Sequence, residues 1–505
     1  MNERVGMVVA GVALHLLLYG ASIPFLFSWD DRKIVLESPE VRGEGPLLAT
    51  LSLPYNPWGY KDPTFGVNYR PLTLLSLGAQ TRLWGLNPGP LHVGNILLGG
   101  IGAGAFGILL SSLGAPAFVA WTSVILLSCH PVRSEPILSI VGRGESLAFL
   151  FLVGALLARR RPVVSGLLFF AAISSKENAF VAPALLLLVL VADAIREEEA
   201  IPWRARVLSL VPLGLVWGSA LLLAFAARFL VLGGFFFGSS ARISAGDNLF
   251  AALSPIDRFM GALSLFPLAV RRVLWPTVLS PDYSKTTFLA DQLLEPGAVA
   301  AGAVLLVAVL ALAALLLFVR SLRDRAPLAW LGLAWALVSY FPFANFLFPN
   351  GISFTERILY APAAGVVLAA ACALGAFRER SAGRPALRLL PPLVVVLLAL
   401  IGSAKILWIL PDWRDDRTLM EAVARDVPTN SKAFWNLAIL SLGEGKSAEA
   451  SRHLARALAL DPNYRAQVGE LIRHAEAIGR PDEAAALAAV LRSAPVRPVR
   501  SAREP

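Results

Sequence analysis

The chain has 505 residues, of which 56% are hydrophobic and only 16% are charged, and its mean hydropathy is +0.64. This charged fraction lies far below the roughly 25% of soluble domains, which excludes an ordinary soluble fold and indicates an integral membrane protein. The net charge is +10, and the basic residues cluster between apolar segments, which indicates that they set the membrane topology. We therefore expect no nucleic-acid partner. The two cysteines, Cys129 and Cys372, give no disulfide framework and no metal-ligand spacing.

The apolar segments predict about eleven spans, because a membrane-spanning helix needs about 20 apolar residues. The predicted spans are Val5–Phe27, Leu91–Leu113, Ala117–Cys129, Pro136–Ala158, Val163–Ile173, Ala179–Ile195, Val207–Leu232, Ala298–Phe318, Pro327–Phe348, Ile358–Leu374 and Leu389–Leu410. The first is longer than the core of a cleaved signal peptide, so we interpret it as an uncleaved span. A further segment, Ile256–Leu279, is interrupted by arginines.

The distribution of arginines predicts the topology, since basic loops stay in the cytoplasm. Arginines occur before the first predicted span and after the fourth, sixth, eighth and tenth: Arg4, Arg159–Arg161, Arg196, Arg204, Arg206, Arg320, Arg323, Arg325, Arg378, Arg380, Arg384 and Arg388. All of them are cytoplasmic only if the N-terminus is inside and Ile256–Leu279 is a re-entrant or interfacial helix on the outer side. The predicted fold class is therefore an all-α polytopic membrane protein, with everything after Leu410 extracytoplasmic.

The tail after Pro411 is polar and repeats with a period of 34 residues. Pro428 recurs as Pro462, and Gly445, Glu449 and Ala450 recur as Gly479, Glu483 and Ala484. This is the period of tetratricopeptide (TPR) helix pairs, which form an α-solenoid. We expect a membrane domain over residues 1–410, TPR-like helical repeats over 411–494 and a disordered end over 495–505.

Two adjacent carboxylates, Asp30 and Asp31, follow the first span directly. They could be a solvated cap at a helix end. A long polar loop follows them, however, and other charged clusters share the predicted outer face. In that setting a carboxylate can act as general base and take a proton from an attacking hydroxyl. We therefore treat Asp30 and Asp31 as candidate catalytic residues.

Further charged residues lie at the outer ends of later spans. The cations Lys176, Arg271, Arg272 and Arg357 could simply extend towards the interface, or they could bind a lipid phosphate. We expect Arg143 and Glu145 to face away from lipid, where they could form a structural ion pair or orient the acidic residues. No P-loop or dinucleotide fingerprint is evident, which disfavours nucleotide-driven chemistry.

The order of these motifs resembles one known family. The matching motifs are Trp29-Asp30-Asp31, Tyr69-Arg70-Pro71-Leu72-Thr73, Pro90-Leu91-His92-Val93-x-Asn95, His130-Pro-x-x-Ser-Glu135, Gly142-Arg143-x-Glu145, Ser175-Lys176-Glu177, Glu356-Arg357-x-Leu359-Tyr360-x-Pro362 and the TPR tail. Together they resemble the transmembrane-and-TPR family of protein O-mannosyltransferases, which have the GT-C fold of polyprenol-dependent glycosyltransferases. The tail has fewer TPR units than the animal members have, and the composition is typical of a bacterial protein.

The resemblance implies inverting transfer of a sugar, mannose in the family, from a polyprenyl-phosphate donor to a hydroxyl of a protein or glycan at the outer face of a bacterial inner membrane. Asp30 and Asp31 match the family's catalytic acidic residues, and Lys176, Arg271, Arg272 and Arg357 would stabilise the phosphate leaving group. The residues expected to support them are Tyr69, Arg70, His92, His130, Glu135, Arg143, Glu145, Glu177 and Glu356. Such a reaction needs no metal, although Glu135 near Asp31 could hold a divalent cation. The TPR tail would bind a protein partner.

Two other functions are compatible with a membrane domain and a repeat tail. A non-enzymatic scaffold would use the tail alone and would have no need of Asp30 and Asp31. A lipid or glycan transporter would place charges near the middle of the bilayer on several spans. The charges in this chain gather at the predicted outer face, which favours the enzyme.

Overall fold

The computed structural model describes residues 2–55, 68–197, 203–233, 248–283, 286–324 and 326–494. Every regular element within these ranges is a helix, which confirms the all-α prediction. The end expected to be disordered, 495–505, lies outside the described residues.

Seven helical segments are long and apolar enough to cross a membrane. They contain α1 (Glu3–Tyr19), α4 (Pro88–Ser112), α9 (Ala182–Arg196), α10 (Trp203–Leu232), α13 (Pro296–Phe318), α16 (Tyr360–Arg380) and α18 (Leu390–Ile409). Three shorter apolar helices are α5 (Ala117–Ser128), α8 (Pro162–Ser175) and α15 (Ala329–Tyr340). Each of these helices overlaps a predicted span, and the seven long ones confirm a polytopic helical membrane protein.

The predicted span Pro136–Ala158 is not one continuous helix. The segment is a bent pair, Pro131–Leu138 with α6 (Ser134–Leu138) and then α7 (Arg143–Leu157), and the two parts meet at 113°. Glycine permits the bend, because a Cβ at Gly142 would lie 2.7 Å from the Cα of Pro136. The break leaves the backbone of residues 139–141 outside a helix and open to bonding by another element.

A small helical layer covers the end of the bundle where α1 finishes. It consists of η2 (Arg32–Leu36), α2 (Pro39–Arg42), η3 (Leu47–Ser52) and α3 (Pro71–Trp84). Val35 and Val41 are buried there against Leu74 and Leu77 of α3. No predicted span corresponds to α3, because its apolar stretch is too short to cross a membrane.

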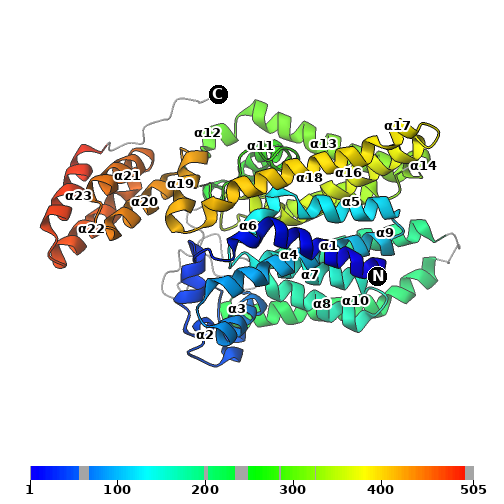
Figure 1. Cartoon of the computed structure of the whole chain (residues 1–505), viewed down its shortest axis with the longest axis horizontal. Coiled ribbons are helices and arrows are strands. Elements are labelled where there is room, and N and C mark those ends of the chain that lie inside the picture. The colour runs from blue at the N-terminus through cyan, green and yellow to red at the C-terminus, as the bar shows by residue number, and fades with distance from the viewer. Residues whose placement is uncertain are drawn as a thin grey trace.

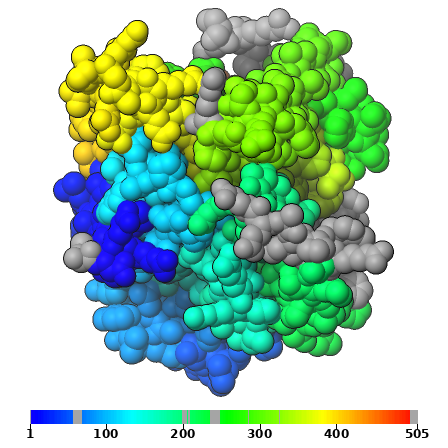
Figure 2. Space-filling view, turned by 90° about the vertical axis from the view of Figure 1, so that its right-hand side faces the viewer, coloured from blue at the N-terminus to red at the C-terminus, as the bar shows by residue number. Residues whose placement is uncertain are grey.

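The bundle has two distinct ends (Figure 1). The N-terminus lies at one end with α14 (Arg320–Arg323) and α17 (Pro385–Arg388), and the tail lies at the other. Figure 2 looks onto the first end and shows the start of α1 and the basic turns around α14 and α17 on one face. Among the other predicted cytoplasmic residues, Arg325 lies outside the described residues, as do the side chains of Arg204 and Arg206.

The arginine-interrupted segment forms α11 (Pro255–Leu274), which is not among the helices apolar enough to cross. It is seen nearly end-on in Figure 1, so it runs across the direction of the spans. Its middle packs closely on α13, where a Cβ at Gly302 would meet the carbonyl of Leu263. This arrangement agrees with the predicted re-entrant or interfacial helix.

The tail begins with η11 (Leu410–Trp413) and α19 (Asp416–Asp426), followed by two helical hairpins. The hairpin helices are α20 (Ser431–Gly443), α21 (Ser447–Leu460), α22 (Arg465–Ala477) and α23 (Pro481–Ser493). Both helices of the second hairpin begin 34 residues after their counterparts, at 465 against 431 and at 481 against 447. The repeat is therefore a repeat of helix pairs, and its assignment as TPR stays a prediction.

The remaining short elements connect these helices. They are η1 (Gly20–Ser22), η5 (Pro131–Arg133), η6 (Glu177–Val181), η8 (Leu249–Ala252), α12 (Ala290–Leu293), η9 (Phe341–Phe343), η10 (Glu356–Leu359) and η12 (Pro462–Tyr464).

Close contact between α1 and α4 depends on glycine, as is common where membrane helices approach each other. A Cβ at Gly100 would lie 2.6 Å from the Cα of Val12. We expect Gly100→Ala to lower the free energy of unfolding by about 1–3 kcal/mol, because the helices must separate. Gly214→Ala is the matched control, since no atom lies within 4 Å of a Cβ there. Thermal unfolding in detergent measures both, and equal stability of the two variants would contradict this packing.

Candidate functional site

Asp31 is fully buried at the end of the bundle that carries the tail. Its Oδ1 accepts hydrogen bonds from the hydroxyl of Ser139 at 3.2 Å and from the backbone N–H of Val141 at 2.9 Å. Its Oδ2 accepts from the N–H and the hydroxyl of Ser28 at 3.3 and 3.4 Å. Burial raises the pKa of Asp31 to about 6, although these hydrogen bonds oppose the shift. Asp31 therefore joins the end of α1 to the break between α6 and α7.

Asp30 occupies a different environment from its neighbour. Its side chain is half-buried, and it lies close enough to Arg357 and Tyr55 to interact electrostatically with both. The preceding residue, Trp29, has a φ of 49°, a left-handed conformation that a bulky residue rarely adopts. This turn directs the two adjacent carboxylates into different surroundings. Of the pair, Asp30 is the one that a substrate could reach.

Two ion pairs lie beside Asp30. Arg357, at the start of η10, has its Nη1 3.5 Å from Oε1 of Glu135, which α6 contributes. Lys176 follows α8 and pairs at 2.5 Å with Glu145 of α7, which also accepts hydrogen bonds from Asn178. Arg357 is the more open of these cations, with 29% of its side chain exposed against 11% for Lys176.

A third group extends the cluster towards α3 and α10. Arg70 Nε binds Glu177 Oε2 at 2.8 Å and stacks over the ring of Tyr55. Glu177 also faces Arg228 of α10 at 3.5 Å. Buried charges are tolerated in such a setting when each one faces an opposite charge. The cluster is therefore a set of paired charges around the half-buried Asp30.

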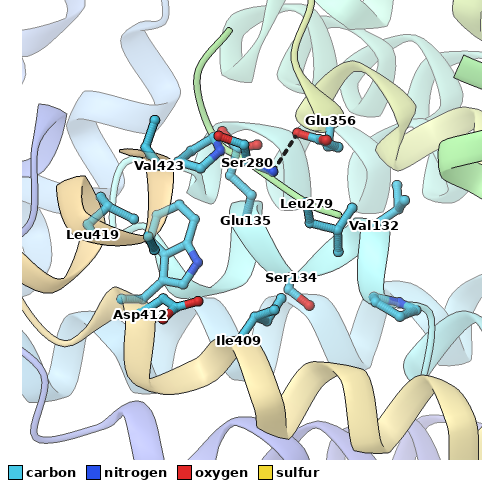
Figure 3. Close-up of a pocket in the computed structure, with 14 residues that line it drawn as sticks. Val132, Ser134, Glu135, Leu279, Ser280, Glu356, Ile409, Asp412, Leu419 and Val423 are labelled. Carbon is cyan, nitrogen blue, oxygen red and sulfur yellow. Dashed lines mark hydrogen bonds between the residues drawn. The ribbon is translucent and has the colours of Figure 1, made fainter. Parts of the chain in front are cut away.

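Glu356 belongs to a fourth group of polar contacts. With Ser280 and Glu135 it lines a pocket between the membrane bundle and the tail (Figure 3). Glu356 accepts hydrogen bonds from the N–H of Ser280 and from the hydroxyl of Tyr283, and it lies 3.6 Å from Arg272. Figure 3 shows Glu356 and Glu135 on one side of this pocket, with Asp412 and Leu419 of the tail opposite.

Other residues predicted for the site have different surroundings. Arg143 and Glu145 do not pair with each other, because Arg143 binds Asn95 and the carbonyls of Leu91 and Ser76. No hydrogen-bond partner is found among the described residues for either ring nitrogen of His92 or for Nδ1 of His130. Tyr69 donates to the carbonyl of Leu51.

The two adjacent arginines of α11 separate. Arg272 is buried and faces Glu356, whereas Arg271 lies on the exposed side of the helix. Adjacent residues on a helix point in directions about 100° apart, so one helix cannot direct both at the same group. Lys176, Arg272 and Arg357 each pair with a different buried glutamate, and Asp30 lies within electrostatic range of Arg357. Arg271 lies apart from these pairs. The roles expected for these residues stay predictions.

Several residues of the site were not found from the sequence. Asn178 and Tyr55 have no distinguishing pattern, and Arg228 lies in a long apolar span. Arg228 could have been found, because an arginine within a span indicates a buried partner. Among the described residues, no group of three or more His, Cys, Asp or Glu side chains is placed to hold a metal ion.

Asp31 gives a pH-dependent prediction. The folded protein takes up a proton on Asp31 at higher pH than the unfolded chain does, since its pKa rises from 3.8 to about 6. Its contribution to the free energy of unfolding is thus fullest below about pH 4 and declines as the pH rises towards 6. We expect Asp31→Ala to cost about 1–3 kcal/mol by leaving donors unpaired, and to cost more at pH 5 than at pH 7.

Thermal unfolding at the two pH values measures this effect. Asp324→Ala is the control, because Asp324 is exposed and pairs only with Arg320 among the described residues. A loss that is the same at pH 5 and pH 7 would contradict the burial of an ionisable Asp31.

Comparisons with known proteins find similarity to proteins named as O-mannosyl-transferases. The chain is 24% identical over 469 residues to a Caenorhabditis elegans protein named protein O-mannosyl-transferase F38B6.6, covering 90% of this chain and 62% of that protein. It is 24% identical over 538 residues to Drosophila melanogaster protein O-mannosyl-transferase Tmtc1, covering 89% of this chain and 61% of that one. It is 31% identical over 175 residues to mouse protein O-mannosyl-transferase TMTC1, covering 33% and 18%.

No family model matches the chain, and no solved structure does. The chain spans about three-fifths of the length of the first two of these relatives. It is thus similar, over most of its own length, to proteins named as protein O-mannosyl-transferases.

Proposed function

We propose that the chain is a membrane glycosyltransferase that transfers a sugar, mannose by analogy with the names of its relatives, from a polyprenyl phosphate to a hydroxyl group. The observation that carries the proposal is that Asp30 lies within electrostatic range of Arg357, a partly exposed arginine that pairs with Glu135. A half-buried carboxylate beside an open arginine supplies a proton acceptor and a phosphate-binding group at one place. The GT-C fold and the bacterial origin belong to the same proposal.

In this mechanism Asp30 acts as general base. The acceptor hydroxyl oxygen forms a bond to the anomeric carbon while the bond from that carbon to the phosphate oxygen breaks. The hydroxyl proton goes to the carboxylate of Asp30, and the polyprenyl phosphate leaves with the electron pair. Arg357, supported by Glu135, would hold two phosphate oxygens with its planar guanidinium. Lys176 and Arg272 would add positive potential from their paired positions.

The proposed orientation follows from the two ends of the bundle. The helices α14 and α17, which carry Arg320, Arg323 and Arg388, lie at the end that holds the N-terminus, away from the tail (Figure 1). The positive-inside rule would place that end in the cytoplasm and the charged cluster outside, with the tail beside it. The helical hairpins α20–α23 would then meet a protein acceptor or partner at the outer face.

The first test removes the base. Asp30→Asn keeps the side-chain volume and should lower kcat by about 10²–10⁴-fold, the usual effect of losing a general base. The measurement is transfer of labelled sugar from a synthetic polyprenyl-phosphate donor to acceptor in reconstituted vesicles. Glu37→Gln, an exposed acidic residue of the same segment, is the control. Near-normal kcat in Asp30→Asn would remove Asp30 as the base.

The second test concerns the donor phosphate. Arg357→Gln should raise the donor KM by roughly 10- to 150-fold, since a charge-assisted hydrogen bond contributes about 1.5–3 kcal/mol. Arg357→Lys, which keeps the charge beside Glu135, should lose less. Arg271→Gln should have the smallest effect of these variants, because Arg271 is exposed on the far side of α11 from Glu356. An unchanged donor KM in Arg357→Gln would contradict the phosphate assignment.

A further inference from the structure

The first helix of the tail contacts the turn that carries Asp30. Oδ1 of Asp416 accepts a hydrogen bond from the backbone N–H of Trp29 at 2.5 Å. Its Oδ2 lies 2.8 Å from Nε of Arg32. One carboxylate from α19 therefore binds the chain on both sides of Asp30. This contact joins parts of the sequence that are separated by the whole membrane domain.

Other contacts place the tail firmly on the same turn. The N–H of Leu26 donates to the carbonyl of Arg414 at 3.0 Å. Trp29 packs in an apolar cluster with Trp413 and Leu419, and Lys432 of α20 lies 5.3 Å from the centre of its ring. The turn is thus fixed from the membrane side by Asp31 and from the tail side by Asp416.

The turn needs such support because Trp29 has a φ of 49°. A bulky residue stays in the left-handed region only when its surroundings hold it there. Relaxation of Trp29 towards ordinary backbone angles would rotate the next residue, Asp30, away from its place beside Arg357. Reactions of this kind are sensitive to displacement of a reacting group by about 1 Å.

We infer that Asp416 is a positioning residue for the transfer reaction, through which the tail holds Asp30 at the site. The inference rests on the proposed role of Asp30 as general base. Of the two contacts of Asp416, the bond to the Trp29 amide is the important one. Arg32 is 58% exposed, and exposed ion pairs contribute little.

Kinetics of the full-length protein in vesicles test this inference. Asp416→Ala removes both contacts and should lower kcat by about 10- to 100-fold while the donor KM stays within about twofold. Asp416→Asn keeps an oxygen for the Trp29 amide and should retain most of the activity, as should Arg32→Gln. Asp426→Ala is the matched control on the same helix, because Asp426 pairs with the exposed Arg425 and is not seen to contact the turn.

The same variants made in an Asp30→Asn background separate the two claims. If Asp416 acts through Asp30, then Asp416→Ala causes no further loss there. Normal kcat in Asp416→Ala, together with a large loss in Asp30→Asn, would overturn this inference and leave the proposed function intact. Near-normal kcat in Asp30→Asn would instead remove Asp30 as the base, and this inference would fall with that assignment.

Hydrogen exchange gives a second readout that does not depend on activity. Amide exchange in the peptide covering residues 26–33 should become faster in Asp416→Ala and stay unchanged in Asp426→Ala. Unchanged exchange in Asp416→Ala would show that the turn does not depend on Asp416, and would overturn the inference whatever the kinetics.

Discussion

The burial of the Asp31 carboxylate at the mouth of the bundle is the constraint on which the site depends. A carboxylate removed from water is costly unless donors replace its hydration. The donors come from Ser28 before it and from Ser139 and Val141 in the broken span. The break at 113° is what makes those groups available, because a continuous helix would use the amide of Val141 internally. The bend and the aspartate thus require each other.

Fixing Asp31 determines where its neighbour can go. With Trp29 left-handed and Asp31 buried, Asp30 is directed to the edge of the bundle, where Arg357 approaches. The pairs Glu135–Arg357 and Glu145–Lys176 then balance the charges that gather around it. The tail completes the enclosure through Asp416, so the membrane bundle and the tail share one set of contacts.

Part of this arrangement could be predicted from the sequence. The positions of the membrane helices could be predicted from the apolar segments, because burial in a bilayer requires continuous apolar stretches. The period of 34 residues predicted the repeated helix pairs that form the two hairpins of the tail. The pair Asp30–Asp31 was singled out because adjacent carboxylates at the end of a span are hard to explain by packing. None of these patterns could tell which carboxylate is buried, since that depends on donors more than 100 positions away at Ser139 and Val141.

Other features depend on contacts that no local pattern records. The bend after α6 requires Gly142, but glycine in an apolar segment is equally common where helices simply pack closely. In the sequence, Asp416 has only the pattern of an acidic residue at the start of a helix. Its contact with the backbone N–H of Trp29 is visible only in the folded chain. Arg271 and Arg272 are equivalent in the sequence. In the structure, the helix directs Arg272 into the protein towards Glu356 and Arg271 outwards.

The central claim is that Asp30 and Arg357 face the reacting bond of a lipid-linked sugar. The most direct measurement is a structure of the protein in nanodiscs with a non-hydrolysable polyprenyl-phosphonate sugar bound. The phosphonate oxygens should lie within hydrogen-bond distance of the Arg357 guanidinium, and the anomeric carbon should lie on the side of the Asp30 carboxylate. A phosphonate bound at the other end of the bundle, beside Arg320 and Arg388, would contradict this claim.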